Sequence, residues 1–245
     1  MLKGFWKLTW VETKVFVREP MGVVGTLIIP VILFLMLGRT FRLGGQTVTT
    51  TAPFNVAILA ALFIAVGAVL SLVAIISIYR EGGILKRLRA TPLSPVTILG
   101  SHVFVKLVFT ALGLGLLIFA GRQSFPGAMQ VDVVSFTGAV LLGTLSILSL
   151  GFLLASIVPT ARFAQPIGAA VLYPMVALSG LFYPIDRFPR GLQYVANVLP
   201  TTHAVQLMEG VWNGSGWLAH GGNVMALIAI FLVCVGISTK VFRWE

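Results

Sequence analysis

The chain has 245 residues, of which 58% are hydrophobic and only 10% are charged, with 17 lysines and arginines against seven acids. A soluble domain of this length could not bury so much apolar surface behind so few charges, so the composition indicates an integral membrane protein. The formal net charge of +10 does not indicate a nucleic-acid partner. The basic residues lie in short clusters between apolar runs, as expected of loops that face anionic membrane lipid.

Residues 1–19 predict an amphipathic helix that lies in the membrane interface. Its basic residues form one stripe on a helical wheel: Lys3, Lys7, Lys14 and Arg18. Phe5, Leu8 and Phe16 lie roughly opposite this stripe, although Glu12 interrupts the apolar side. Such a helix keeps its basic stripe toward headgroups and water and its apolar side in the membrane.

Six apolar stretches follow, each long enough to cross a bilayer core of about 30 Å. They cover residues 21–38, 54–78, 96–120, 133–158, 163–183 and 217–241. The fourth is rich in glycine and serine, which permit close helix contact in lipid. The third contains Lys106, which we expect to snorkel to the membrane interface; the alternative is a contact with substrate or a partner. The expected fold is an all-α membrane protein with six transmembrane helices, formed by one membrane domain over residues 1–245.

The stretch 79–95, YREGGILKRLRATPLSP, is the polar interruption between the second and third spans. A helix here would place an apolar edge beside a basic face. Most of the 17 basic residues lie on the side of this stretch and of the two termini, so the positive-inside bias places that side in the cytoplasm. Two interpretations follow: a basic loop that only fixes orientation, or a short helix that docks on a soluble partner.

The segment 184–216, between the fifth and sixth spans, predicts two short helices with apolar faces on the outer side. Thr201 or Thr202 can cap the second helix, and Val205, Met208 and Val211 recur on one of its faces. Backbone that bends within a bilayer must be shielded by protein, so these helices are expected to cover the exit side of the domain. An ordinary structured outer loop is the alternative.

The chain has no pattern typical of a catalytic or metal site, and we predict neither. A phosphate-binding G-x-x-x-x-G-K-[ST] loop does not occur, and the three histidines are far apart in the sequence. An intramembrane serine protease would need the motif G-x-S-G, but Ala177 stands two residues before Ser179. It would also need a histidine that reaches this serine from another span, and none is indicated.

Three stretches resemble the membrane subunits of the ABC-2 permease family, close to bacterial drug and antibiotic export permeases. They are REGGILKRLRATPLSP at 80–95, ALSGLFYPIDRFP at 177–189 and LPTTHAVQLMEGVWNG at 199–214. The resemblance also covers the N-terminal elbow helix and the six spans, which is nearly the whole chain. It implies that 79–95 is a coupling helix that docks on a separate ATP-binding subunit, with these contact residues: Arg80, Glu81, Ile84, Leu85, Lys86, Arg87, Leu88 and Arg89.

By this resemblance the chain is not itself an enzyme, binds no cofactor and leaves ATP and Mg²⁺ to the partner subunit. It would pair with a second permease copy, identical or related, in the bacterial cytoplasmic membrane with both termini inside. The expected activity is export of a hydrophobic or amphipathic substrate such as a drug, an antibiotic or a lipid-linked compound. Phe63, Tyr173 and Phe182 are candidate path-lining residues. The alternatives are export of a polysaccharide or lipid-linked glycan, a non-transporting scaffold, and the serine protease.

Overall fold

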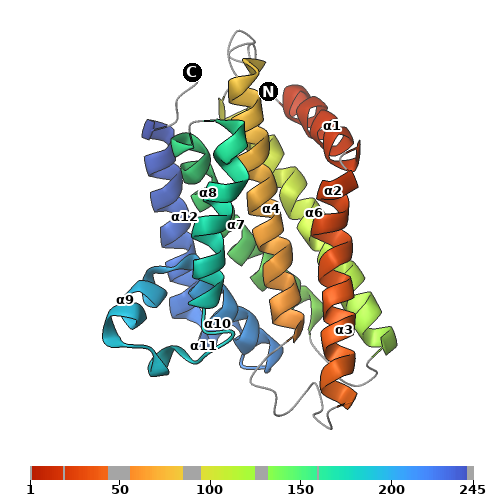
Figure 1. The fold of residues 1–245 in the computed structure, drawn as a ribbon, viewed down its shortest axis with the longest axis vertical. Helices are drawn as coiled ribbons and strands as arrows, with labels where there is room; N and C mark the ends of the chain where they lie inside the picture. The colour runs from red at the N-terminus through yellow and green to blue at the C-terminus, as the bar shows by residue number, and fades with distance from the viewer. Residues whose placement is uncertain are drawn as a thin grey trace.

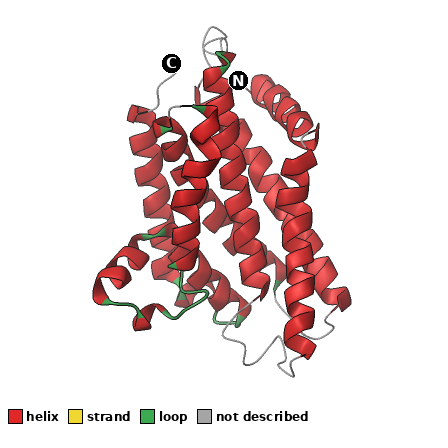
Figure 2. Ribbon diagram, viewed as in Figure 1, coloured by secondary structure: helices red, strands yellow, loops and turns green. Residues whose placement is uncertain are grey.

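A computed structural model describes residues 2–18, 20–43, 56–84, 95–124, 132–158 and 160–241 of the chain. Every regular element within those ranges is helical (Figure 2), which confirms the prediction of an all-α protein. The elements in chain order are α1 (Leu2–Arg18), α2 (Pro20–Val23), a π-helical turn (Val24–Ile28), α3 (Ile29–Leu43), α4 (Val56–Glu81), α6 (Pro95–Ser124), α7 (Val133–Ile157), α8 (Ala161–Ala177), a 3₁₀ turn (Ile185–Arg187), α9 (Arg190–Val198), α10 (Pro200–Trp212), α11 (Gly216–Ala219) and α12 (Gly221–Val241).

The helix α4 is the centre of the bundle and packs against α3, α6, α7, α8 and α10 (Figure 1). Its sequence is almost entirely Ala, Val, Leu and Ile, and most of its side chains between Ile58 and Ile76 are fully buried. A helix that is apolar all round has no face suited to water and takes a core position. The last helix, α12, packs against α7 and α10.

Small residues bring the helices of the bundle into close contact, as predicted for the fourth apolar stretch. A Cβ atom added to Gly151 of α7 would lie 2.7 Å from Cγ1 of Val69 on α4. One added to Gly143 would lie 2.8 Å from Cβ of Ala204 on α10. Because real Cβ atoms do not come this close, glycine at these two positions sets the distance between α7 and its neighbours.

Four of the described helical segments are long and apolar enough to cross a membrane: Ile58–Glu81, Gly100–Ser124, Val133–Ile157 and Gly221–Ser238. The chain is therefore a multi-pass membrane protein. The first predicted span lies in the helical run α2–α3, which holds a shorter apolar segment, Val24–Leu37. The fifth lies in α8, which has 17 residues. Both segments are helical, but the prediction of six transmembrane helices is not confirmed.

The predicted boundaries differ from the structure where local backbone geometry ends a helix. The fifth predicted span, 163–183, is helical only to Ala177, since Gly180 adopts a positive φ of 92° in the turn that follows. The third continues past residue 120 to Ser124, and the sixth begins as α12 only at Gly221.

The predicted cap of α10 is wrong. Pro200 occupies the first turn of this helix, and its N-cap residue, Leu199, makes no side-chain hydrogen bond. The hydroxyl of Thr201 instead donates to the carbonyl of Met175 on α8, at 2.9 Å. A buried hydroxyl needs a partner, and here it joins two helices instead of capping one. The apolar face of α10 through Val205 is confirmed, because that face is buried against the bundle.

The start of α1, the end of α4 and the end of α12 lie at the same end of the bundle, which we call the terminal end (Figure 1). The helices α9, α10 and α11 lie toward the opposite end. The helix α1 is inclined to the bundle and packs on α6 and α2. The terminal end thus brings the amphipathic helix next to the point where α4 leads into the stretch 79–95.

Candidate functional site

The helix α1 buries one face at the terminal end. Thr9, Glu12 and Phe16 are buried, and their spacing of three and four residues places them on one side of a helix. Trp6 and Trp10 are more than half exposed on other sides. The amphipathic helix predicted over residues 1–19 is therefore present as α1, with Phe16 on its buried side as expected.

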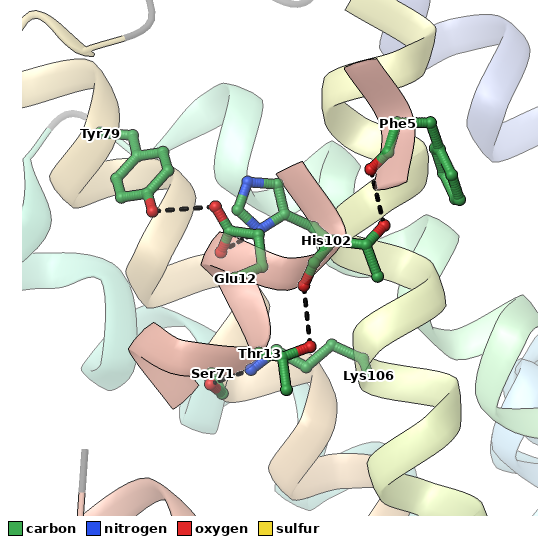
Figure 3. Close-up of polar contacts among 8 residues, drawn as sticks. Phe5, Glu12, Thr13, Ser71, Tyr79, His102 and Lys106 are labelled. Atoms are coloured by element: carbon green, nitrogen blue, oxygen red, sulfur yellow. Dashed lines mark hydrogen bonds and ion pairs between the residues drawn. The ribbon is translucent and has the colours of Figure 1, made fainter. Parts of the chain in front are cut away.

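Glu12 is buried because two polar side chains from other helices meet it (Figure 3). The hydroxyl of Tyr79, near the end of α4, donates to Oε1 of Glu12 at 3.0 Å. Nδ1 of His102 on α6 lies 3.1 Å from Oε2 of the same carboxylate. A carboxylate is costly to bury without partners, and these two contacts supply one to each oxygen. Glu12 thus joins α1 to both α4 and α6.

Lys106 lies one turn beyond His102 on α6. The prediction that it snorkels to the membrane interface is wrong. Its side chain is only 6% exposed. Nζ donates to the hydroxyl of Ser71 on α4 at 2.6 Å (Figure 3). It also lies 4.4 Å from the centre of the Phe16 ring. The amphipathic helix covers this part of α6, so the ammonium meets protein where the prediction expected lipid headgroups.

We call Glu12, Ser71, Tyr79, His102 and Lys106 the elbow cluster. All of these residues except Tyr79 line a cavity of about 10 Å³, the size of a single water, together with Phe16 and nearby apolar side chains. The cluster is a polar group of contacts inside an apolar bundle, at the place where α1, α4 and α6 meet. Its contacts join three helices: Glu12 on α1 meets Tyr79 on α4 and His102 on α6, and Lys106 on α6 meets Ser71 on α4.

Lys106→Met tests whether the buried ammonium matters for stability. Methionine keeps the apolar stem but leaves the Ser71 hydroxyl without its donor and removes the cation from the Phe16 ring. We expect a loss of about 1–3 kcal/mol, seen as a lower melting temperature of the purified protein in detergent. Lys14→Met changes an exposed lysine of α1 in the same way and should change the melting temperature little. Equal melting temperatures for the two variants would contradict this role of Lys106.

The last turn of α4 is fixed to the junction of α7 and α8. The guanidinium of Arg80 donates to the carbonyl of Ala155, at 3.1 Å, and to the carbonyl of Val158. Both acceptors belong to the C-terminal end of α7. The carboxylate of Glu81 accepts a hydrogen bond from the backbone N–H of Ala161, the first residue of α8, at 2.8 Å. A cation at a helix C-terminus and an anion at a helix N-terminus each match the helix dipole.

A turn at Gly82 and Gly83 ends α4 immediately after these contacts. The N–H of Gly82 bonds to the carbonyl of Ile78, and Gly83 has a φ of 67°, which glycine adopts without strain. Ile84 follows and is exposed. The helix α4 therefore ends at a defined point. Its last turn is held to α7 by Arg80, to α8 by Glu81 and to α1 by Tyr79.

Of the predicted ATPase-contact residues, Arg80, Glu81 and Ile84 lie within the described residues. The contacts of Arg80 and Glu81 given above are made inside this chain, and their part in docking stays a prediction. The others lie outside the described residues: Leu85, Lys86, Arg87, Leu88 and Arg89.

The three residues predicted to line a substrate path lie on α4, on α8 and in the loop after α8. Phe63 is partly buried on α4, Tyr173 is exposed on α8, and Phe182 is exposed in the loop after α8. The helices α4 and α8 pack against each other. The contact of these residues with a substrate stays a prediction.

The sequence prediction missed the elbow cluster, although two signals for it were present. An acid on the apolar side of an amphipathic helix, Glu12, requires a buried polar partner if that side packs on protein. His102 and Lys106 are four residues apart on a predicted span and therefore share one helix face. Together these signals indicate a polar contact between the first helix and the third span.

A family model described as the ABC-2 type transporter matches residues 3–211 of the chain. Nodulation protein J of Rhizobium meliloti (strain 1021) is 26% identical over 113 residues, which cover 46% of this chain and 41% of that protein. Nodulation protein J of Bradyrhizobium diazoefficiens (strain JCM 10833 / BCRC 13528 / IAM 13628 / NBRC 14792 / USDA 110) is 27% identical over 122 residues, 44% of this chain and 47% of that protein. The inner membrane transport permease YhhJ of Escherichia coli (strain K12) is 26% identical over 156 residues, 62% of this chain and 41% of that protein.

The chain thus spans less than half the length of these curated relatives. The family model, in contrast, extends from α1 to the end of α10 and includes the elbow cluster and the end of α4. The match agrees with the resemblance found in the three sequence stretches. The chain belongs to the ABC-2 type transporter family.

Proposed function

We propose that this chain is the transmembrane permease subunit of an ATP-binding cassette exporter that moves a hydrophobic or amphipathic molecule outward. ATP and Mg²⁺ are bound by a separate nucleotide-binding subunit, which docks on the stretch 79–95. The family match and the similarity to an inner membrane transport permease support a transport role. The proposal extends these findings to the energy source, the direction and the class of substrate.

One observation carries the coupling part of the proposal: the first residues of the docking stretch are attached to three parts of the bundle. Arg80 holds the end of α7, Glu81 holds the start of α8, and Tyr79 holds α1 through Glu12. A force applied at 85–94 by closure of the ATP-binding subunits would act on all of these helices and on α4. A conformational equilibrium shifts only through a difference in contacts between two states, and this attachment gives ATP binding a route to such contacts.

The remaining parts of the proposal concern topology and assembly. Six spans arise when α2–α3 and α8 cross the membrane together with the four longer helices. The terminal end is cytoplasmic, in line with the basic residues on that side, and α9 and α10 then lie at the outer side. A second permease copy completes a path beside α4 and α8, to which Phe63, Tyr173 and Phe182 contribute. Its apolar character suits a drug, an antibiotic or a lipid-linked compound.

The contacts of Ser179 give the protease alternative no support. Its hydroxyl is buried, donates to the carbonyl of Val176 at 2.6 Å and lies 3.5 Å from the N–H of Leu181. These are the contacts of a residue that holds the turn after α8, where Gly180 has its positive φ. Ser179 is therefore interpreted as a structural residue at a helix end.

Purification of the tagged chain with its natural partners tests the proposal. The chain is extracted in mild detergent, moved into nanodiscs and analysed for co-purifying subunits and for mass. We expect an ATP-binding subunit in near-equal amount and two permease copies in each complex. The complex in sealed liposomes should then move a hydrophobic fluorescent probe when ATP is present on the side of the ATPase, and not with a non-hydrolysable analogue.

Two results would contradict the proposal. A chain that purifies without any ATP-binding protein, from cells in which its neighbours are intact, would favour a scaffold. Probe movement that is independent of ATP would favour a different energy source. Movement of an oligosaccharide and not of the hydrophobic probe would support an ATP-driven permease but contradict the proposed class of substrate.

A further inference from the structure

A polar pocket of about 240 Å³ lies away from the elbow cluster, where α10, the turn after it and the start of α12 meet. Its polar lining consists of Gln206, Glu209, Asn213, Ser215, His220 and Asn223. Apart from the imidazole of His220, the lining contains no aromatic side chain, and it contains no lysine or arginine. Its volume is enough for a small polar group of several heavy atoms and far exceeds the space of one water.

The walls of the pocket are fixed by packing and hydrogen bonds. Asn223 links two histidines: its amide lies 3.0 Å from Nδ1 of His203 and 3.4 Å from Nδ1 of His220. His203 also contacts the carbonyl of Asn197, at 2.9 Å. The ring of His220 lies directly on Gly210, where an added Cβ would be 2.0 Å from Nε2. These contacts hold one wall of the pocket in place before any ligand enters.

Glu209 is the charged group of this pocket. Among the described residues its carboxylate has no hydrogen bond or ion pair with a side chain, whereas Glu12 accepts from the Tyr79 hydroxyl and Glu81 from the backbone N–H of Ala161. Burial raises the pKa of the Glu209 carboxyl, because a partly desolvated carboxylate loses hydration. A partly buried carboxylate without a partner costs free energy, and a cation that entered the pocket would offset this cost.

We propose that this pocket binds a protonated primary amino group, with Glu209 as its counter-ion. An ammonium has three N–H donors and no acceptor. The pocket offers a matching set of acceptors: the Glu209 carboxylate and the side-chain amide oxygens of Gln206 and Asn213. The lining has no tryptophan, tyrosine or phenylalanine on which a sugar ring would stack, and no lysine or arginine that would pair with an anion.

The ammonium can come from a soluble amine or from the headgroup of an aminophospholipid. The first source places the pocket on the route of an amine-bearing molecule, and the second makes it a lipid site at the side of the bundle. Both use the same contacts with Glu209. Binding is a property of the permease alone, so it is tested without an ATP-binding subunit, and its failure would leave the proposed transport function untouched.

The test uses dansylcadaverine, a fluorescent primary amine, and the purified chain in phosphatidylcholine nanodiscs. We expect saturable binding by fluorescence anisotropy, which Glu209→Gln weakens at least about tenfold, since glutamine keeps the shape but not the charge. Asp186→Asn removes another carboxylate, an exposed one in the loop before α9, and should leave binding unchanged. Gln206→Ala should weaken binding by a smaller factor, because it removes one neutral acceptor. An uncharged dansyl amide of similar size should not bind saturably.

A second arm separates the two sources. In nanodiscs that contain phosphatidylethanolamine, whose headgroup is a primary ammonium, binding of the probe should be competed if lipid occupies the pocket. It should be unaffected if the pocket takes only soluble amines. Equal binding by the wild-type and Glu209→Gln proteins in phosphatidylcholine, or equal binding of the uncharged amide, would overturn the proposal. Melting temperatures of each variant establish that a loss of binding is not a loss of fold.

Discussion

Leu88→Asp should weaken binding of the ATP-binding subunit by at least about a hundredfold. In a coupling helix over 79–95 the leucine would be buried in the partner, which is worth roughly 1.5–3 kcal/mol. Aspartate loses this contribution and places an unpaired carboxylate in the contact. A change of 1.4 kcal/mol is tenfold in affinity, so the sum exceeds a hundredfold. The measurement is the amount of ATP-binding subunit retained on the tagged permease, followed by binding of the purified subunit to permease nanodiscs.

Leu218→Asp is the matched control. Leu218 lies on α11, away from the terminal end, and is 99% exposed, so the same chemical change there removes no burial within this chain. Both variants should reach the membrane in normal amounts, and only Leu88→Asp should lose the ATP-binding subunit and transport. If Leu88→Asp keeps both, the stretch 79–95 serves only to orient the chain, which is the other interpretation of its basic residues.

The helices of the bundle could be predicted from the sequence because their causes are local. Long apolar runs with small residues produce helices wherever they occur, and the glycines of α7 make close contacts that follow from their size. The sequence predictions were wrong where helices begin and end. Gly180 and Pro200 set where α8 and α10 end and begin, and a hydropathy pattern does not contain that information.

The elbow cluster could not be predicted in detail because its contacts join residues far apart in the sequence. Glu12 and Tyr79 are separated by 67 positions, and Lys106 meets Ser71 across 35. The sequence indicates that an acid lies on an apolar helix face but not which helix covers it. The prediction that Lys106 snorkels was wrong for the same reason. It expected lipid headgroups beside a part of α6 that α1 covers.

The end of α4 has a role that the sequence did not indicate. The charges and apolar edge of 79–95 left two interpretations, an orientation signal and a docking helix, and the family resemblance implied docking. In the structure Arg80 and Glu81 reach the C-terminus of α7 and the N-terminus of α8. Charge and spacing do not reveal which helix termini come within reach of a side chain. The docking role of the residues after Ile84 still rests on the sequence and the family.

His102→Leu should destabilise the protein more than the double change Glu12→Leu with His102→Leu. The single change leaves the Glu12 carboxylate in an apolar setting with the Tyr79 hydroxyl as its remaining partner. Loss of a hydrogen bond to a charged group costs about 1.5–3 kcal/mol, which for a chain of this size lowers the melting temperature by roughly 3–12 °C. The double change removes the carboxylate as well, and replacing both members of a buried polar pair by apolar residues is often close to neutral.

His102→Gln is the matched control, because its amide can still donate to Glu12 and it should retain most of the stability. The melting temperatures of the two single leucine variants and of the double variant form a cycle, in which we expect a coupling energy of about 0.5–3 kcal/mol. Additive effects would show that Glu12 and His102 do not act together, and α1 would then be held to α6 by apolar contacts such as those of Phe16 with Phe109 and of Phe5 with Phe104. A positive coupling would mean that α1 is fastened, through Glu12, to α6, the helix that follows the docking stretch. That fastening is what the proposed transmission from the ATP-binding subunit requires of the elbow cluster.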